Sequence, residues 1–376
     1  MIYFDNSSTT SVHPEVRRVY GQLLETTYGN PDSMHTLGRK ASTLLETSRK
    51  NIAQMLHVKP EEIIFTGCAS ESNSLAIIGY ALANAHRGKH ILLGAVEHAS
   101  VEHAGQWLQQ FGYEVDYLPI NDAGIITPQV VQEAMSEDTI LVSIMHVNNE
   151  IGAINPIEAI EKIVHAHPTC SFHVDCVQSF SKLPIPFEKL DMATISAHKI
   201  HGLKGSALLM KKKKVQLMPL IQGGQQEQGL RGGTENAPAN IVLSKTIRLA
   251  LEHQKEKYDH VKKINTYIRQ ELMKIPGTII NSPEDGLPYI LNISFAEMTS
   301  EVLMNALDQK GICVSAKSTC SSHSQSASKV LLMMHKSEKE ATHMIRLSFD
   351  ENNTMEEAKT FIEACKEIIK NYGLHL

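Results

Sequence analysis

The sequence predicts an α/β protein with a mostly parallel central sheet flanked by helices, followed by a smaller α+β C-terminal domain. Short apolar segments alternate with amphipathic helical patterns over the first part of the chain, which is typical of βαβ units. After a long helical stretch at about 237–273 the rhythm changes to strand, helix, polar loop, strand and final helix. We therefore expect a large α/β domain at 14–257 and a small domain at 258–376 that also includes 1–13.

The elements follow from hydrophobic periodicity and cap residues. A helix is expected at 36–57, a short apolar strand at 62–66, and another helix opening near residue 70. Further strand-like segments lie at 90–95, 113–119, 139–146, 171–176, 192–198 and 206–210. The second part shows a strand at 289–295, a helix at 300–310, a strand at 344–349 and a final helix at 355–371.

Composition disfavours several classes of protein. The net charge of −5 argues against general binding to nucleic acid or to an anionic membrane. The six cysteines form no CxxC pair and no Cys/His cluster with zinc-ligand spacing, so no metal site is expected. The N-terminus does not resemble a signal peptide, and no apolar run approaches the ~18 residues of a membrane span. We expect a cytoplasmic protein without nucleic-acid or membrane partners.

Polar side chains follow several of the predicted strands, at the carboxyl ends where ligands of such sheets gather. They are His98, Asn149, Asp175, Gln178, Ser196, His198 and Lys199. After the first strand, the sequence GCASESN opens a helix whose N–H groups and hydroxyls would suit a phosphate. Taken alone, an ordinary serine N-cap explains that segment more simply, and each of the other residues is a weak signal.

Together these residues match the needs of pyridoxal phosphate, which takes a lysine for covalent attachment, an acid beside its pyridine nitrogen and donors around its phosphate. Asp175 would keep the ring nitrogen protonated, and Lys199 would hold the cofactor and later move the substrate α-proton. The alternative for Lys199 is a surface lysine at a strand end, although Ser196 and His198 beside it weaken that interpretation. No GxGxxG follows a predicted strand and no GxxxxGK[ST] occurs, which disfavours nucleotide cofactors.

Eight motifs occur in order along nearly the whole chain: YFDNSSTT, FTGCASESNSLAI, VEHAS, HVNNEIG, HVDCVQSFSKLPI, SAHKIHGLKG, GGQQEQGLRGGTEN and IRLSF. In these motifs the chain resembles the NifS/IscS-type cysteine desulfurases of the class V aminotransferase family, which implies the fold of the fold-type I pyridoxal-phosphate-dependent transferases. By that resemblance, Lys199 is the cofactor-binding lysine, Asp175 pairs with the pyridine nitrogen, and His98 stacks over the ring and relays protons. Gln178 and Asn149 contact the ring hydroxyl and the substrate region.

The same resemblance assigns contacts to the phosphate, the substrate and a second subunit. The phosphate is held by Ala69, Ser70, Ser196 and His198. Thr234 is expected to reach the phosphate of the neighbouring subunit in a homodimer, and Arg346 to bind the substrate carboxylate through its fork of donors.

One cysteine, Cys320, lies in the stretch SAKSTCSSHSQSAS at 315–328. A free cysteine usually behaves as a small buried hydrophobe, but this stretch has no apolar residue larger than alanine, so an exposed polar loop is expected. For the residue alone, an idle surface thiol is the simpler interpretation. By the resemblance, Cys320 is the catalytic thiol, and its distance in sequence from Arg346 resembles that of the long-loop members.

The implied activity converts L-cysteine to L-alanine and passes the sulfur as a persulfide to Cys320. A sulfur-acceptor protein, an iron–sulfur scaffold or a tRNA- or cofactor-thiolating enzyme, would then take it. The alternatives are a selenocysteine lyase or another aminotransferase of this fold, in which Cys320 would be dispensable, and a catalytically silent sulfur-relay scaffold. The joint presence of Lys199, Asp175, His98, Cys320 and Arg346 argues against the scaffold.

Overall fold

The computed structural model describes residues 1–316 and 327–372, and its largest unit is a seven-stranded sheet in the order β2-β8-β7-β6-β5-β3-β4. Its strands are β2 (Ile63–Thr66), β3 (His90–Gly94), β4 (Glu114–Leu118), β5 (Thr139–Met145), β6 (Ser171–Asp175), β7 (Met192–Ser196) and β8 (Ala207–Lys211). Strand β8 runs antiparallel to both neighbours, and all other pairs are parallel. The expected α/β fold with a mostly parallel sheet is therefore confirmed.

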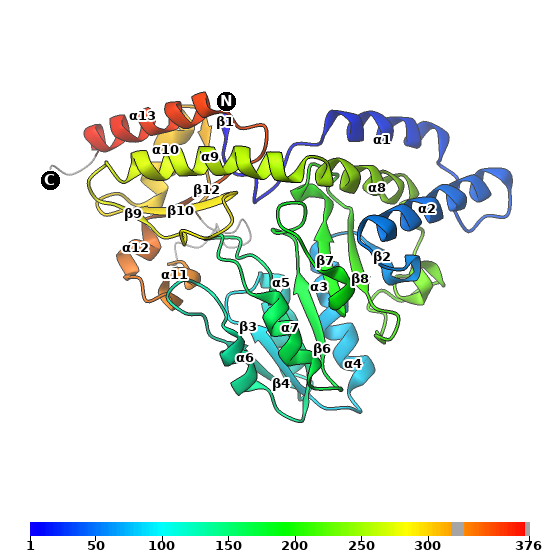
Figure 1. Ribbon diagram of the computed structural model, residues 1–376. Helices are drawn as coiled ribbons and strands as arrows, with labels where there is room; N and C mark the ends of the chain where they lie inside the picture. Colours follow the sequence, from blue (N-terminus) through cyan, green and yellow to red (C-terminus); the bar gives the residue numbers. More distant parts are fainter. Residues whose placement is uncertain (317–326, 373–376) are drawn as a thin grey trace.

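Both faces of this sheet are buried, because successive side chains of a strand point to opposite faces. In β2, Ile63 and Phe65 belong to one hydrophobic core and Ile64 to another. The first core also takes side chains from α2 (Thr36–Met55), α6 (Pro128–Ala134), α7 (Ile157–His165) and α8 (Ala237–Leu251). The second takes them from the π-helical turn Leu75–Gly79, α4 (Tyr80–Asn84) and α5 (Ala99–Gln109). The sheet is thus the middle layer of three (Figure 1).

Two expected helices are interrupted. The helix expected from about residue 70 begins as α3 (Ala69–Ser74) and passes through the π-helical turn into α4. The stretch expected at 237–273 is two helices, α8 and α9 (Gln254–Leu272), because His253 between them has a φ of 56°, outside the right-handed helical region. A further helix, α1 (Pro14–Thr26), was not expected and packs on α8.

A second, three-stranded antiparallel sheet lies beyond α9, with the order β12-β10-β9. Its strands and the remaining helices are β9 (Thr278–Ile280), β10 (Ile290–Phe295), β12 (Met344–Ser348), α10 (Ser300–Gln309), α11 (Lys329–Met333), α12 (Glu338–Thr342) and α13 (Met355–Tyr372). The chain's first strand, β1 (Ile2–Tyr3), pairs in parallel with β11 (Ile312–Cys313) beside this sheet (Figure 1). The division at residues 257 and 258 stays a prediction.

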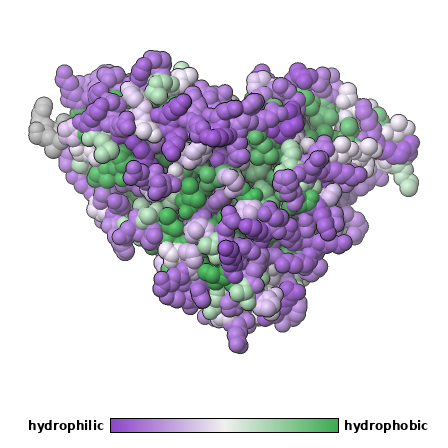
Figure 2. Space-filling model, viewed as in Figure 1, coloured by the Kyte–Doolittle hydropathy of each residue, from purple (hydrophilic) through white to green (hydrophobic). Residues whose placement is uncertain are grey.

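The surface is mostly hydrophilic on the face drawn in Figure 2, with hydrophobic side chains gathered near its centre. Within the described ranges, no helix has the length and apolar character needed to cross a membrane.

A buried ion pair between Arg49 and Glu227 attaches the glycine-rich segment 223–236 to β2, the edge strand of the large sheet. Arg49 of α2 makes two hydrogen bonds to the Glu227 carboxylate, at 2.8 and 2.9 Å, and a third to the carbonyl of Ile63 at 2.7 Å. Glu227 also accepts from the backbone N–H of Phe65 at 2.8 Å. Arg49 is 5% exposed and Glu227 is 4% exposed, so loss of either partner would leave a buried charge uncompensated.

We therefore expect Arg49→Ala to lower the free energy of unfolding by about 3–5 kcal/mol, measured by urea denaturation at fixed protein concentration. Arg248→Ala is the matched control: Arg248 pairs with Glu252 on the half-exposed surface of α8, and its loss should cost no more than about 1 kcal/mol. Equal losses from the two variants would contradict the role of the buried pair.

Candidate active site

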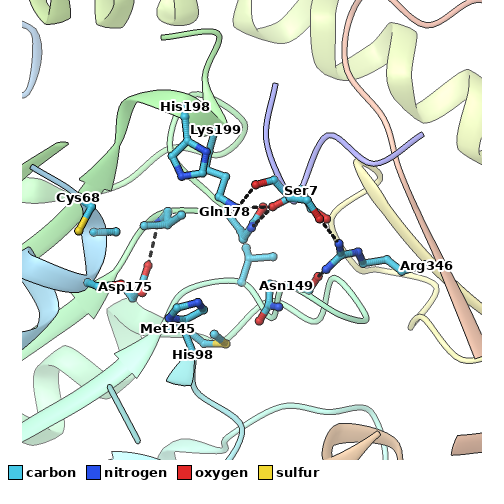
Figure 3. Close-up of a pocket in the computed structure, with 15 residues that line it drawn as sticks. Ser7, Cys68, His98, Met145, Asn149, Asp175, Gln178, His198, Lys199 and Arg346 are labelled. Atoms are coloured by element: carbon cyan, nitrogen blue, oxygen red, sulfur yellow. Dashed lines mark hydrogen bonds between the residues drawn. The ribbon is translucent and has the colours of Figure 1, made fainter. Parts of the chain in front are cut away.

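A cavity of about 230 Å³ lies at the carboxyl ends of β5, β6 and β7, where the sequence places its polar residues (Figure 3). Most of the predicted site residues line it: Ala69, Ser70, His98, Asn149, Asp175, Gln178, His198, Lys199 and Arg346. All of these except Arg346 lie on strands of the large sheet or in the turns and helices directly after those strands. Arg346 comes from β12 of the second sheet.

Two predicted residues lie elsewhere, and the position of a third is not described. Ser196, at the end of β7, is buried and lines a neighbouring cavity that shares His198 with the first. Thr234 is exposed and does not line the cavity of this single chain. Cys320 falls outside the described residues.

Lys199 ends the short turn that follows β7 and points toward the N-terminal segment (Figure 3). Its Nζ donates to the carbonyls of Ser7, at 2.5 Å, and Ser8, at 2.8 Å. Burial lowers the pKa of Lys199 to about 8, and the positive charges of Arg346 and Lys182 act in the same direction. The neutral, nucleophilic form of this amine is therefore far more populated near neutral pH than that of an ordinary lysine.

Asp175 and His98 occupy the same side of the cavity (Figure 3). The Asp175 carboxylate accepts from the backbone N–H of Val177 and from Asn73 Nδ2, each at 2.9 Å. His98 caps α5, and its Nδ1 accepts from the backbone N–H of Ser100 at 3.1 Å. Burial lowers the pKa of His98, as does the charge of Lys199, while the Asp175 carboxylate raises it. The imidazole is accordingly neutral at neutral pH.

Arg346 is 1% exposed and is held on three sides. It donates to the Asp5 carboxylate at 3.0 Å, to Ser8 Oγ at 2.8 Å and to the carbonyl of Asn149 at 3.0 Å. Its Nε has no hydrogen-bond partner within the described part of the chain. A guanidinium fixed in this way beside Lys199 can bind an anionic group in a set orientation.

Sequence reasoning missed several residues of this site. Ser7 and Ser8 lie in the quoted motif YFDNSSTT, but nothing local signals that their carbonyls accept from a lysine about 190 positions away. Glu97, before His98, is buried and accepts from the backbone N–H of Met145 at 2.6 Å. Burial, with the nearby charge of Asp175, raises the pKa of Glu97 well above its ordinary value.

Three buried polar atoms beside the cavities test which ligand would fit. Ser7 Oγ, Gln178 Oε1 and Ser196 Oγ have no hydrogen-bond partner among residues 1–316 and 327–372. Buried polar atoms are rarely left without one, so a ligand with several polar groups fits this space. Pyridoxal phosphate offers an aldehyde for Lys199, a pyridine nitrogen for Asp175 and phosphate oxygens for hydroxyl donors, and the residues present fit it. In the same ranges, no group of three His, Cys, Asp or Glu side chains is arranged to hold a metal ion.

The described residues on either side of 317–326 are attached at the cavity. Ser315 exchanges two backbone hydrogen bonds with Arg346, at 2.6 and 3.2 Å. On the other side, Ser328 Oγ donates to Glu150 at 2.7 Å, next to the cavity residue Asn149. Ser315 and Ser328, which precede and follow Cys320 in sequence, are therefore both held beside the site.

Comparison with known proteins gives consistent matches along the whole chain. Residues 2–361 match the family described as aminotransferase class-V. A NifS/IcsS protein homolog of Lactobacillus delbrueckii subsp. bulgaricus is 42% identical, covering 99% of this chain and 98% of that protein. Cysteine desulfurase IscS 1 of Archaeoglobus fulgidus is 36% identical, covering 98% and 97%.

Solved structures agree with these relatives. A NifS-like protein superposes with a TM-score of 0.93 at 35% identity, covering 98% of this chain and 99% of that one. A structure described as SspA in complex with cysteine gives a TM-score of 0.83 at 32% identity, covering 94% and 100%.

The lowered pKa of Lys199 gives a direct test. In cofactor-free protein, pulse acetylation of Lys199 followed by peptide mass spectrometry should rise with pH around a midpoint near 8, because only the neutral amine reacts. Lys182→Met removes one of the charges that lower this pKa, so the midpoint should move upward. Lys255 serves as the reference: its side chain is exposed, and Asp259 raises its pKa, so its acetylation midpoint should lie well above that of Lys199. A Lys199 midpoint equal to that of Lys255, and unchanged by Lys182→Met, would contradict the assignment.

Proposed function

Because the chain belongs to the aminotransferase class-V family, we propose that it is a pyridoxal-phosphate-dependent cysteine desulfurase that passes the sulfur of L-cysteine through Cys320. Relatives of the same length are named cysteine desulfurases. The single observation that carries the proposal is the convergence of Lys199, Asp175 and Arg346 on one cavity. That cavity joins a nucleophilic amine, a carboxylate and a guanidinium, which are the groups that a cofactor-bound amino acid needs.

The cofactor would be held by residues that already surround the cavity. Lys199 would bind its aldehyde, Asp175 its pyridine nitrogen and Gln178 its ring hydroxyl, with His98 over the ring. The phosphate would be held by Ala69, Ser70, Ser196 and His198. When bound, pyridoxal phosphate supplies an electron sink for a negative charge that develops on the substrate.

The substrate would be positioned by its two ends. Arg346 would bind the carboxylate of L-cysteine, with Asn149 beside it, since the guanidinium is buried and its orientation is fixed by Asp5 and Ser8. Lys199 Nζ lies in the same cavity and would remove the proton from the substrate α-carbon.

Cys320 would act on the substrate sulfur. Its thiolate attacks that sulfur, so that a sulfur–sulfur bond forms while the bond from sulfur to the substrate β-carbon breaks. The carbon fragment keeps the bonding electron pair, gains a proton at the β-carbon and regains one at the α-carbon to become L-alanine, and Cys320 is left as a persulfide. The backbone pairing of Ser315 with Arg346 supports this role, because it places a residue close to Cys320 in sequence on the strand that would bind the substrate.

Delivery would follow in the cytoplasm, where a protein acceptor would take the persulfide sulfur for iron–sulfur cluster assembly or for thiolation of tRNA or a cofactor. The enzyme would act as a homodimer, with Thr234 completing the phosphate site of the partner subunit. The exposure of Thr234, in a segment fastened by the Arg49–Glu227 pair, supports that arrangement.

Cys320→Ala tests the sulfur step. We expect the variant to bind L-cysteine, because Lys199, Asp175 and Arg346 are unchanged, but to release almost no alanine. With L-selenocysteine the same variant should keep substantial activity, since selenium leaves carbon more readily and needs less help from a thiolate. Alanine and protein-bound persulfide are the measured products. Turnover of L-cysteine at the parent rate would rule out Cys320 as the sulfur acceptor and favour a selenocysteine lyase or aminotransferase.

A subunit-mixing experiment tests the contribution of Thr234. Thr234→Val should weaken cofactor binding by about tenfold, because it removes one hydroxyl donor to a charged group and keeps the shape of the side chain. In dimers mixed from Thr234→Val and Lys199→Ala chains, one of the two sites regains both residues if Thr234 acts across the interface. Half of the sites should then bind cofactor with parent affinity. A fully active monomer, or no recovery on mixing, would contradict the proposal.

A further inference from the structure

A chain of hydrogen bonds joins Asp175 to His98 through Asn73 and Ser100, two side chains that were not predicted as site residues. Asn73 of α3 donates from Nδ2 to Asp175 Oδ2 at 2.9 Å and to Ser100 Oγ at 3.0 Å. Ser100 Oγ lies 2.8 Å from His98 Nδ1. The two groups that would lie against the cofactor ring are thus linked by a single amide and a single hydroxyl.

The directions of these bonds are fixed by the chemistry of the partners. The Asp175 carboxylate only accepts, so the Asn73 atom that faces it must be the amide nitrogen. Both amide protons are then in use, and Ser100 Oγ accepts one of them. The Ser100 hydroxyl therefore has its own proton available for His98 Nδ1, where the backbone N–H of Ser100 also donates. Because Nδ1 accepts, the proton of the neutral imidazole is on Nε2.

The burial of Asn73 indicates why the amide is present. Asn73 is 0% exposed, and its Oδ1 has no hydrogen-bond partner among the described residues. A buried acceptor without a partner costs free energy, so the side chain must contribute through its two donor bonds. Those bonds go to Asp175 and Ser100 only.

We propose that Asn73 and Ser100 are positioning residues: Asn73 orients the Asp175 carboxylate, and through Ser100 it holds His98 in the tautomer that carries its proton on Nε2. The inference rests on the proposed function, because it assigns Asp175 to the pyridine nitrogen and His98 to the face of one cofactor ring. A neutral His98 in this tautomer donates a hydrogen bond from Nε2 to an acceptor and cannot take up a proton there. His98 would therefore orient a bound group by donation before any proton transfer.

The tautomer can be measured without any catalytic assay. In cofactor-free protein labelled with nitrogen-15 at histidine, His98→Gln identifies the His98 signals. At neutral pH we expect a pyridine-like Nδ1 and a pyrrole-like, protonated Nε2 in the parent. Asp175, Lys199 and His103 are the charged or titratable groups that act on this ring, so the spectra are compared at a pH where all variants have a neutral His98.

Variants distinguish the bond from Asn73 to Asp175 from the bonds that run through Ser100 to His98. Ser100→Ala should reduce the fraction of the Nε2-protonated tautomer, whereas Ser100→Thr keeps the hydroxyl and should restore it. Asn73→Ala should reduce the same fraction, but adding it to Ser100→Ala should change the His98 signals no further, because Asn73 acts through Ser100. Only Asn73→Ala should also weaken cofactor binding, by about tenfold, through loss of its bond to Asp175.

Ser72→Ala is the control for removal of a buried polar group from the same helix. Ser72 is also 0% exposed, but its hydroxyl pairs with Thr66 Oγ1 at 2.7 Å. Neither residue belongs to the hydrogen bonds that link Asp175 to His98, so His98 should be unaffected. A proton on Nδ1 in the parent would overturn the proposal even if a variant failed to fold. Additive effects of Asn73→Ala and Ser100→Ala on His98 would also overturn it. If His98 shows the expected tautomer and the expected responses to the Ser100 and Asn73 variants, but the protein makes no alanine from L-cysteine, only the proposed function is contradicted.

Discussion

The N-terminal segment Asp5–Ser8 is the connection on which the rest of the site depends. Ser348 of β12 holds it, accepting from the backbone N–H of Asn6 at 3.2 Å and, through Oγ, from that of Ser7 at 2.8 Å. Its carbonyls at Ser7 and Ser8 then accept from Lys199, and Asp5 and Ser8 accept from Arg346. Two cationic side chains from different sheets are therefore oriented by four consecutive residues. Neither sheet alone could fix the position of the amine relative to the guanidinium.

The second sheet contributes the substrate side of the site as one unit. Arg346 presents its guanidinium to the cavity, while its backbone is paired with Ser315, which lies shortly before Cys320 in sequence. A movement of β12 would therefore shift the group proposed to hold the substrate and the attachment point of the proposed sulfur acceptor together. Reactions between positioned groups gain most when their relative geometry is preserved in this way.

The sequence was informative where a local pattern determines the secondary structure or the location of the site. Buried strands were recognisable as apolar runs. Ligands gather at the carboxyl ends of parallel strands, so Asp175 and Lys199 were expected near one another, and both line one cavity. The break at His253 was missed because its left-handed backbone conformation occurs at a residue that is not glycine, so no sequence signal marks it. Asn73 was missed because a polar residue near a helix start is usually a cap or a solvated position, and its partners come from β6 and α5. The roles of the site residues stay predictions; those of Thr234 and Cys320 have no described geometry behind them either, since one depends on a second subunit and the other lies outside the described residues.

Charge in the cavity favours a reaction sequence that starts with the free amine. Lys199 shares its surroundings with Arg346 and Lys182, and these cations act together with burial to lower its pKa to about 8. A neutral amine is what attachment to an aldehyde requires. An anionic phosphate and a substrate carboxylate, once bound nearby, would offset the positive charges and raise the pKa of Lys199, since opposite charge favours the protonated form. The excess of positive charge in the free chain would thus favour attachment to the aldehyde, whereas its neutralisation by bound anions would make the same amine a stronger base when the α-proton is removed.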